Sequence, residues 1–557
     1  MSSTTGGTLL ARTLDECGID IVFTLCGNHL LPIYQGLVDR GIRIVDTRTE
    51  ASAVFAADAY ARITRTPAVA MVTGGPGHTN ALTGLATAQA IGSPVLVISG
   101  EAEMALRGRG SLQEMDQLAC ARPLVKTADR IDVADHIARK LNETLTAMMQ
   151  GRVGAASLTI PVDVLEAPVA DAGPGAYMPS PDRGGPGKDT ITAVLRLLRQ
   201  AKRPVVIVGT GAHLDGAENA VSLLLKRCGF PAFTVDMARG LVPDADPYCF
   251  GYADPAVHRQ ASHIAESDCV LILGKNIDFR LHYGGLFAPT ATVIHAARSA
   301  CEFDSAVRRD VQYVGDVAAF AAALAEAADG DWDFEDWRSR IAATRDATLS
   351  EYAAMSSEAA AAGDGRFHPA EVAAAIAPLV DSDTTLVFDA GDFVQWNRSM
   401  LPAPGPGRWI RLGPMSCCGA GTPFALGAKA ARPDDNVLLV TADGGFGYYM
   451  ADFDTALRHD LPFVAILGHN QSWGLERSLQ LGLYGEEYAV ASSLLDTPYH
   501  EVVRALGGFG QRLESLDDLE TVYREAVSSG LPACIEVPIS QAPSPLTSSV
   551  IERGGTH

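Results

Sequence analysis

Two residues with oxygen-bearing side chains each follow an apolar run in the last third of the sequence. The run 438–441 leads through Ala442 to Asp443-Gly444-Gly445, and the run 463–467 leads to Gly468-His469-Asn470. A carboxylate and an amide oxygen are hard ligands that suit magnesium, and glycines let backbone N–H groups approach a phosphate closely. Asp-Gly is also a common turn, so either half alone is better explained as an ordinary strand-to-helix connection, and only the combination favours a metal site.

These residues can share a site only if the elements around them bring them together. Between Gly444 and Asn470 lie 25 residues, which leaves room for a predicted helix at 451–458. The two apolar runs can then lie side by side as parallel strands. The carboxyl ends of parallel strands face one crevice, which is where open α/β sheets bind ligands.

The combination resembles the thiamine-diphosphate-dependent family of acetolactate synthase, pyruvate decarboxylase, benzaldehyde lyase and 2-hydroxyacyl-CoA lyase. Within it, the sequence is most similar to benzaldehyde lyase, through 6–9, 46–50, 452–455 and 470–474. The resemblance implies thiamine diphosphate and Mg²⁺ as cofactors. The implied metal ligands are the side chains of Asp443 and Asn470 and the backbone carbonyl of Ser472. Further implied cofactor contacts are Gly391, Asp392, Gly444, Gly445, Trp473 and Gly474.

Glu50 lies where a predicted strand gives way to a predicted helix at 51–63. A glutamate in the first turn of a helix is favoured by the helix dipole, which is a sufficient structural reason for it. By resemblance, Glu50 is the family's activating glutamate, which hydrogen-bonds the cofactor's aminopyrimidine. The turn 73–80 contains Gly75 and Pro76, which the resemblance places near the thiamine. A Gly-Pro-Gly turn serves a tight strand-to-helix connection equally well.

By resemblance, four polar residues face the substrate: Asn28, His29, Gln113 and Glu476. A histidine with a near-neutral pKa suits proton transfer, and such a group contributes roughly 10²–10⁴-fold to the rate. His29 has the alternative of capping a helix, and Glu476 that of an exposed helical charge. Leu475 and Leu479, one helical turn apart, are predicted to form an apolar wall of the substrate pocket. Ordinary core packing explains the same spacing.

The sequence departs from the family pattern at several positions. Cys418 stands where the family places a bulky residue under the thiamine, so a neighbour such as Met415 is expected to fill the space. Each missing buried methylene would cost roughly 0.8 kcal/mol. By the same match, the backbone of Ser416 and Cys418 contacts the aminopyrimidine. Ala442 replaces a glycine and His469 replaces an asparagine, but neither is an expected metal ligand.

Composition excludes several classes of partner and gives an expected location. The 557 residues carry 44 Lys+Arg against 66 Asp+Glu, a net charge of −22. This balance argues against nucleic acid or an anionic membrane as a partner. No apolar stretch reaches the roughly 18 residues of a membrane span. The N-terminus has no signal-peptide pattern, and the ten scattered cysteines suit reduced thiols, so we expect a cytoplasmic protein.

Alternating apolar runs and helical patterns predict an α/β protein with three domains, each a mostly parallel sheet flanked by helices. We place them at 1–170, 188–350 and 366–557, with linker-like stretches at 166–188 and 356–365. By resemblance they are a pyrimidine-binding, a middle Rossmann-like and a diphosphate-binding domain. Because Glu50 and the metal motif belong to different domains, the resemblance implies a homodimer or homotetramer with active sites at subunit interfaces.

The motifs of the middle domain do not decide between the possible substrate classes. Its Gly209-Thr210-Gly211 is a weak nucleotide-binding fingerprint. Residues 276–284 resemble a segment of 2-hydroxyacyl-CoA lyases, so a CoA thioester remains a candidate substrate. The leading expectation is a lyase or carboligase acting on 2-hydroxy ketones, aldehydes or 2-hydroxyacyl compounds. Alternatives are an acetolactate-synthase-type or decarboxylase enzyme acting on a 2-oxo acid, a flavin- or nicotinamide-binding oxidoreductase, and a non-catalytic subunit.

Overall fold

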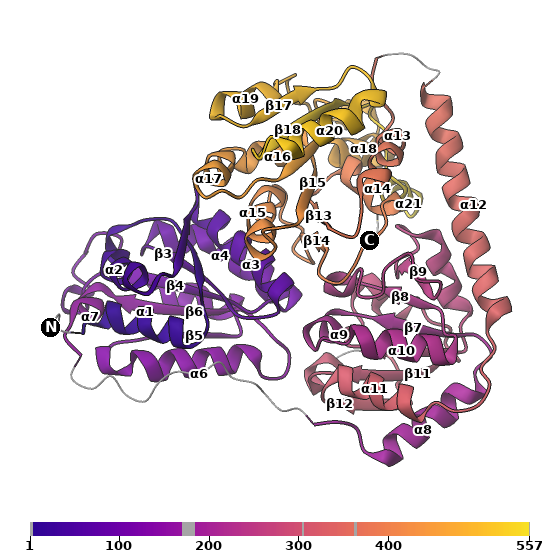
Figure 1. Ribbon diagram of the computed structural model, residues 1–557, viewed down its shortest axis with the longest axis horizontal. Helices are drawn as coiled ribbons and strands as arrows, with labels where there is room; N and C mark the ends of the chain where they lie inside the picture. The colour runs from indigo at the N-terminus through magenta and orange to yellow at the C-terminus, as the bar shows by residue number, and fades with distance from the viewer. Residues whose placement is uncertain (1–3, 170–183, 304–305, 361–364, 556–557) are drawn as a thin grey trace. The chain divides into compact units, whose positions relative to one another are not determined.

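The computed structural model describes residues 4–169, 184–303, 306–360 and 365–555. The chain, whose helices and strands are labelled in Figure 1, divides into two compact units. The first consists of the described residues of 1–182 together with 412–434 and 449–461. The second consists of the described residues of 183–411 together with 435–448 and 462–557. No described helix has the length and apolar character needed to cross a lipid bilayer.

The first unit contains a six-stranded parallel sheet in the order β2-β1-β3-β4-β6-β5. Its strands are β1 (Ile21–Thr24), β2 (Arg43–Asp46), β3 (Ala68–Val72), β4 (Val95–Glu101), β5 (Thr127–Arg130) and β6 (Ala156–Pro161). The central strands β1, β3, β4 and β6 are buried along their whole length, as expected when helices cover both faces of a parallel sheet. The helices that lead to site residues are α2 (Leu31–Arg40), α3 (Glu50–Thr64) and α4 (Pro76–Ile91).

The second unit contains two further parallel sheets of six strands. The middle sheet, in the order β12-β11-β10-β7-β8-β9, is formed by β7 (Pro204–Val208), β8 (Ala232–Thr234), β9 (Cys249–Tyr252), β10 (Cys269–Leu273), β11 (Thr292–Ala297) and β12 (Val311–Val314). The last sheet is formed by β13 (Thr384–Phe388), β14 (Trp409–Arg411), β15 (Asn436–Ala442), β16 (Val464–His469), β17 (Phe509–Arg512) and β18 (Ala533–Pro538).

The first and last sheets have the same topology. The last sheet runs β14-β13-β15-β16-β18-β17, which repeats the order of the first sheet strand for strand. In each, the chain leaves the first strand toward one edge and then crosses to build the other side. The crevice outside the carboxyl ends of the first and third strands is therefore a topological switch point, the usual ligand position in such sheets.

The prediction of three parallel-sheet α/β domains is confirmed, whereas the exact domain boundaries stay a prediction. The linker at 166–188 is framed by α7 (Val162–Glu166) and α8 (Lys188–Gln200), and its residues 170–183 lie outside the described part. The predicted break at 356–365 starts too early, because α12 (Glu335–Ala360) continues to Ala360. Its alanine-rich end favours helix, since alanine is the best helix former. Residues 361–364 lie outside the described part.

Candidate active site

Glu50 is the first residue of α3 and lies beside the first turns of α4. The Thr49 side chain caps α3 by accepting the Ser52 N–H at 3.1 Å. The side-chain amide of Asn80, on α4, donates to Glu50 Oε2 at 3.0 Å. This bond depends on how α3 and α4 pack, so no sequence pattern pointed to it. It engages Oε2, whereas Oε1 has no hydrogen bond to any residue that the structure describes and can accept one from a ligand.

The turn that leads into Glu50 is held by Asp452, the first residue of α17 (Asp452–Arg458). The Asp452 carboxylate accepts the Arg48 N–H at 2.9 Å and the Ser52 hydroxyl. Thr455 donates to the same carboxylate at 2.9 Å. Asp452 is fully buried, and burial raises the pKa of its carboxyl. Because Arg48 and Ser52 flank Glu50 in the chain, Asp452 fixes the backbone that presents the Glu50 carboxylate.

Thr73 joins the predicted polar residues of the first unit at its switch point. His29 Nδ1 lies 3.0 Å from Thr73 Oγ1 and accepts the Gly74 N–H at 3.3 Å. The Thr73 hydroxyl also lies 3.5 Å from Asn28 Oδ1 and 3.5 Å from Gln113 Oε1. The structure thus brings Asn28, His29 and Gln113 together, although sequence reasoning gave Thr73 itself no role.

The hydrogen bonds of His29 decide where its proton lies. Burial lowers the pKa of His29, so the ring is neutral at pH 7. A backbone N–H can only donate, so Nδ1 accepts and the proton of the neutral ring lies on Nε2. The predicted proton-transferring histidine therefore presents a hydrogen-bond donor at Nε2 in its resting state.

Gly75 is required by the turn itself, apart from any contact with a cofactor. Its φ is +61°, and a side chain there would meet Gln113, with Cβ atoms 2.7 Å apart. The buried Gln117 holds the turn, since Oε1 accepts the Gly75 N–H at 3.0 Å and Nε2 donates to the Gly100 carbonyl at 3.0 Å. Pro76 is the first residue of α4. That Gly75 and Pro76 touch the thiamine stays a prediction.

The predicted metal ligands gather at the carboxyl ends of β15 and β16. These strands pair in parallel up to Ala442 and Gly468, so Asp443 and Asn470 follow at the same edge. Asp443 is 1% exposed, and its carboxylate accepts the Gly444 N–H at 2.9 Å and the Ser472 N–H at 3.2 Å. Asn470 Oδ1 is buried and has no hydrogen-bond partner within the described ranges.

This donor set fits a hard divalent cation. Burial raises the pKa of the Asp443 carboxyl, because a buried negative charge is poorly solvated. A nearby cation would offset that cost, and it would give the orphaned Asn470 oxygen a partner. Asp443, Asn470 and the Ser472 carbonyl are therefore the residues that would hold Mg²⁺.

Two helices begin at this edge of the sheet. α16 (Asp443–Tyr449) begins at Asp443, and α18 (Gly474–Tyr484) begins just after Trp473. A side chain at Gly444 would lie 2.6 Å from the Trp473 ring, so glycine allows the two helix starts to approach. Backbone N–H groups at helix starts favour phosphate oxygens. This arrangement suits the predicted diphosphate contacts of Gly444, Gly445, Trp473 and Gly474, which remain predictions.

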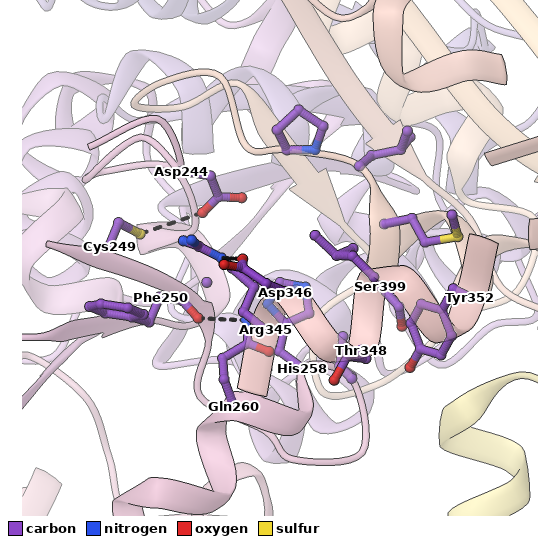
Figure 2. A pocket seen from close by; sticks show the side chains of 16 residues that line it. Asp244, Cys249, Phe250, His258, Gln260, Arg345, Asp346, Thr348, Tyr352 and Ser399 are labelled. Atoms are coloured by element: carbon purple, nitrogen blue, oxygen red, sulfur yellow. Dashed lines mark hydrogen bonds and ion pairs between the residues drawn. The ribbon is translucent and has the colours of Figure 1, made fainter. Parts of the chain in front are cut away.

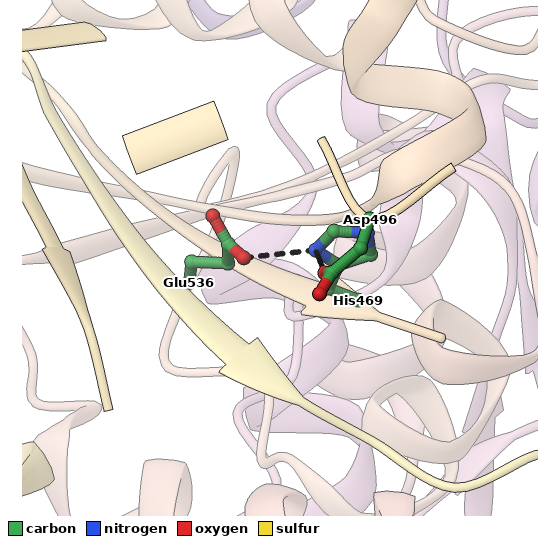
Figure 3. A group of neighbouring side chains, drawn as sticks. All are labelled: His469, Asp496 and Glu536. Carbon is green, nitrogen blue, oxygen red and sulfur yellow. Dashed lines mark hydrogen bonds and ion pairs between the residues drawn. The ribbon is translucent and has the colours of Figure 1, made fainter. Parts of the chain in front are cut away.

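His469, a departure from the family pattern, is supported by a buried carboxylate on the neighbouring strand (Figure 3). His469 Nδ1 lies 2.8 Å from Glu536 Oε1, and its Nε2 lies 3.7 Å from Asp443 Oδ2. Although burial favours the neutral ring, the hydrogen bond to Glu536 and the charge of Asp443 raise the pKa of His469. His469 thus stands between two carboxylates and stabilises the charge of Asp443.

The group His469, Asp496 and Glu536 is an ion-pair network, although its ligand-type atoms lie within 4.8 Å of one another. Arg512 Nη1 lies 2.9 Å from Glu536 and 3.1 Å from Asp496. His500 Nδ1 lies 2.7 Å from the other Glu536 oxygen. Since cationic groups already compensate these carboxylates, the network supports the Asp443 edge instead of forming a second metal centre.

Asp392 and Gly391 follow β13, at the switch point of the last sheet. Asp392 is the first residue of α14 (Asp392–Met400) and is 4% exposed. Its Oδ1 accepts the Ser544 N–H at 3.2 Å and the Thr547 hydroxyl, at the start of α21 (Pro545–Glu552). The C-terminal helix thus holds this carboxylate in place. Cofactor contacts of Gly391 and Asp392 stay a prediction.

The remaining predicted site residues lie at accessible positions. Glu476 is exposed in the first turn of α18, and Leu475 and Leu479 are half-buried on one face of that helix. Cys418 is half-buried and Ser416 is exposed, while Met415, expected to fill the space beside Cys418, is 49% exposed. The functional roles of these residues stay predictions.

The carboxyl edge of the middle sheet, where a dinucleotide would bind, carries buried ion pairs. Lys275 Nζ lies 3.1 Å from Asp236 Oδ2 and contacts Asp278, and Arg280 Nε lies 3.0 Å from Asp236 Oδ1. A side chain at Gly209 would meet Lys275, so the glycine of the weak fingerprint serves close packing. The local geometry gives the oxidoreductase alternative no support.

A cavity of about 360 Å³ lies in the second unit between β9 and α12 (Figure 2). Its polar side chains include Thr348, which donates to the Thr344 carbonyl, and Asp244, which pairs with Arg239. A second cavity of about 410 Å³ is lined in part by Trp396 and by residues of α21. Neither cavity is lined by a predicted site residue.

Comparison with known proteins gives matches over most of the chain. Three models, described as thiamine pyrophosphate enzyme N-terminal TPP binding, central and C-terminal TPP binding domains, match residues 4–120, 191–324 and 389–537. A probable acetolactate synthase of Mycobacterium bovis is 37% identical over 95% of each chain. The 2-hydroxyacyl-CoA lyase 2 of Bos taurus is 32% identical, and that of Homo sapiens 31%, over 94% of this chain and 87% of theirs.

Replacing Asp452 tests whether it positions Glu50. We expect Asp452→Ala to leave the Arg48 N–H and the Ser52 hydroxyl without their acceptor and to lower turnover by about tenfold, as loss of a supporting hydrogen bond commonly does. Asp39→Ala, at an exposed position on α2 of the same unit, is the matched control. Turnover and urea unfolding are measured for both. Full turnover in Asp452→Ala would show that the Glu50 turn holds its shape without it.

The pH dependence of stability tests the Glu536 network. Although burial opposes ionisation, the hydrogen bonds from His469 and His500 lower the pKa of Glu536 to about 2 from an ordinary 4.5. Its contribution is fully present above pH 4.5 and is lost as the pH falls toward 2. We expect a loss of about 2 kcal/mol between pH 5 and pH 3 by linkage. Urea unfolding should show that Glu536→Gln flattens this slope, and equal slopes would contradict the account.

Proposed function

The chain belongs to the thiamine pyrophosphate enzyme family, and on this premise we propose that it is a Mg²⁺-dependent lyase or carboligase. It breaks or makes a carbon–carbon bond next to a carbonyl group. Its substrates are 2-hydroxy ketones, aldehydes or 2-hydroxyacyl compounds, CoA thioesters among them. The observation that carries the proposal is the cluster of Asn28, His29 and Gln113 around Thr73, at the switch point of the first sheet.

The thiamine group, when bound, supplies the electron sink for the carbon from which a bond is broken. Glu50 would hydrogen-bond the pyrimidine ring, while the Asn80 amide holds its Oε2. Asp443, Asn470 and the Ser472 carbonyl would hold Mg²⁺, and the ion would compensate the negative charge of the diphosphate. His29 would donate a hydrogen bond from Nε2 to the oxygen of the reacting carbonyl group, where negative charge develops. Asn28 and Gln113 orient the same oxygen.

An acetolactate-synthase-type activity on a 2-oxo acid is the second candidate. It is favoured by the relative named as a probable acetolactate synthase, at 37% identity. The relatives named 2-hydroxyacyl-CoA lyase 2 favour the first candidate. The two candidates differ in the bond that is broken, so a substrate comparison distinguishes them.

We also propose that the enzyme is a homodimer or homotetramer in the cytoplasm, with each active site formed by two subunits. In this arrangement Glu50 of one subunit faces the metal edge of another. Large apolar side chains are exposed beside both sets of site residues. In the first unit these are Leu31 and Leu112, and in the second they are Tyr484, Tyr488, Val490 and Leu495. Exposed apolar groups next to functional residues are typical of interaction surfaces.

A side-by-side assay tests the substrate class. We expect a 2-hydroxyacyl-CoA or benzoin to release aldehyde, with pyruvate turned over more slowly. His29→Ala should retain cofactor binding and lose roughly 10²–10⁴-fold in turnover, because a positioned proton donor is removed. Aldehyde release and pyruvate consumption are followed with the same preparation. Activity on pyruvate alone would reverse the order of the two candidates.

Subunit mixing tests the shared site. Glu50→Gln and Asp443→Asn should each be nearly inactive as pure proteins. In a symmetric dimer, co-expression of the two variants restores about a quarter of wild-type activity, because each mixed dimer keeps one intact site. If co-expression leaves activity at the level of the pure variants, each site is built within one subunit.

A further inference from the structure

The exposed Gln541, which follows the last strand β18, connects the C-terminal segment to Asn470. The Asn470 Nδ2 group donates to Gln541 Oε1 at 3.1 Å. Gln541 Nε2 in turn donates to the Gly474 carbonyl at 2.8 Å and to the Ser478 hydroxyl at 3.1 Å. Gln541 therefore bridges the end of β16 and the first turn of α18.

The directions of these two amides are fixed by a group that cannot change its role. The Gly474 carbonyl can only accept a hydrogen bond, so Gln541 must turn its NH₂ group toward it. Gln541 then has only its oxygen to offer to Asn470. Asn470 must therefore donate from its own NH₂ group, and this orientation directs its Oδ1 to the opposite side. That oxygen is the buried atom without a hydrogen-bond partner in the described ranges.

We propose that Gln541 is a positioning residue that fixes the direction of the Asn470 amide and so presents Oδ1 to Mg²⁺. The inference rests on the proposed function, because Mg²⁺ is the ion that the site is proposed to hold. With the opposite orientation, Asn470 would turn an NH₂ group toward the cation, which is repulsive. Partners that orient a metal ligand commonly change metal affinity 10–100-fold when they are removed.

Two substitutions separate this role from a purely structural one. Gln541→Met has a similar length and no hydrogen bonds, so Asn470 becomes free to rotate. Gln541→Glu keeps an acceptor for the Asn470 NH₂ group but loses the donor to the Gly474 carbonyl. Because Gln541 is exposed, neither change disturbs the core. Gln480→Met and Gln480→Glu, on α18, are the matched controls, since the Gln480 amide donates to the Val490 carbonyl.

The experiment is a calorimetric titration of Mg²⁺ into each protein at saturating thiamine diphosphate, with turnover at saturating Mg²⁺ measured alongside. We expect the dissociation constant of Mg²⁺ to rise 10–100-fold in Gln541→Met. Gln541→Glu and both Gln480 variants should stay near the wild-type value. Turnover at saturating Mg²⁺ should be nearly unchanged throughout.

The possible outcomes separate the inference from its premise. An unchanged Mg²⁺ affinity in Gln541→Met overturns the inference and leaves the proposed function standing. Equal weakening in Gln541→Met and Gln541→Glu shows that Gln541 only clamps α18, and this also overturns it. If the wild-type protein itself takes up no Mg²⁺, the proposed function fails and the inference fails with it.

Discussion

The structure places a carboxylate and an unpartnered amide oxygen side by side in a buried edge, and the rest of the site depends on how their burial is compensated. Asp443 is almost fully buried, and Asn470 Oδ1 has no partner in the part of the chain that the structure describes. Buried polar atoms without partners cost free energy of about 1–3 kcal/mol each. A divalent cation would give the Asn470 oxygen a partner and would compensate the buried negative charge of Asp443. The hydrogen bond between His469 and Glu536 fixes the position of His469 next to Asp443.

The first and last sheets have the same strand order, so the carboxyl edge that carries Asp443 in the last sheet corresponds to the carboxyl edge of the first sheet. In both sheets some of the predicted site residues follow the first and third strands, where the direction of chain building reverses, whereas Glu50 follows β2 and Asn470 follows β16. One crevice holds His29 and Thr73, and the other holds Asp392 and Asp443. The first crevice therefore carries hydrogen-bonding side chains, and the second carries buried carboxylates.

Much of the fold could be predicted from the sequence, because buried parallel strands appear as short apolar runs. The runs at 68–73, 204–208 and 269–273 agree closely with β3, β7 and β10. The metal edge could be predicted for the same reason, since Asp443 and Asn470 directly follow such runs. The extent of α12 could not, because an alanine-rich stretch has no apolar periodicity to mark its end.

The contacts that orient the site residues had no sequence signal. Asn80, Asp452, Gln117 and Gln541 act through hydrogen bonds between segments that are distant in the chain or on different elements. Such pairings depend on packing, and a single sequence contains no periodicity that reports them. Likewise, the fully buried Glu536 on β18 explains why a histidine can stand at position 469, yet nothing near either residue in the sequence connects the two.

The most direct measurement is a calorimetric titration of thiamine diphosphate into the wild-type protein, with Mg²⁺ and then with EDTA, repeated with Asp443→Asn. The account predicts binding of one cofactor per chain that requires Mg²⁺ and is lost in Asp443→Asn, because the diphosphate is held through the metal. Binding that is equally tight in EDTA, or no binding under any condition, would contradict it.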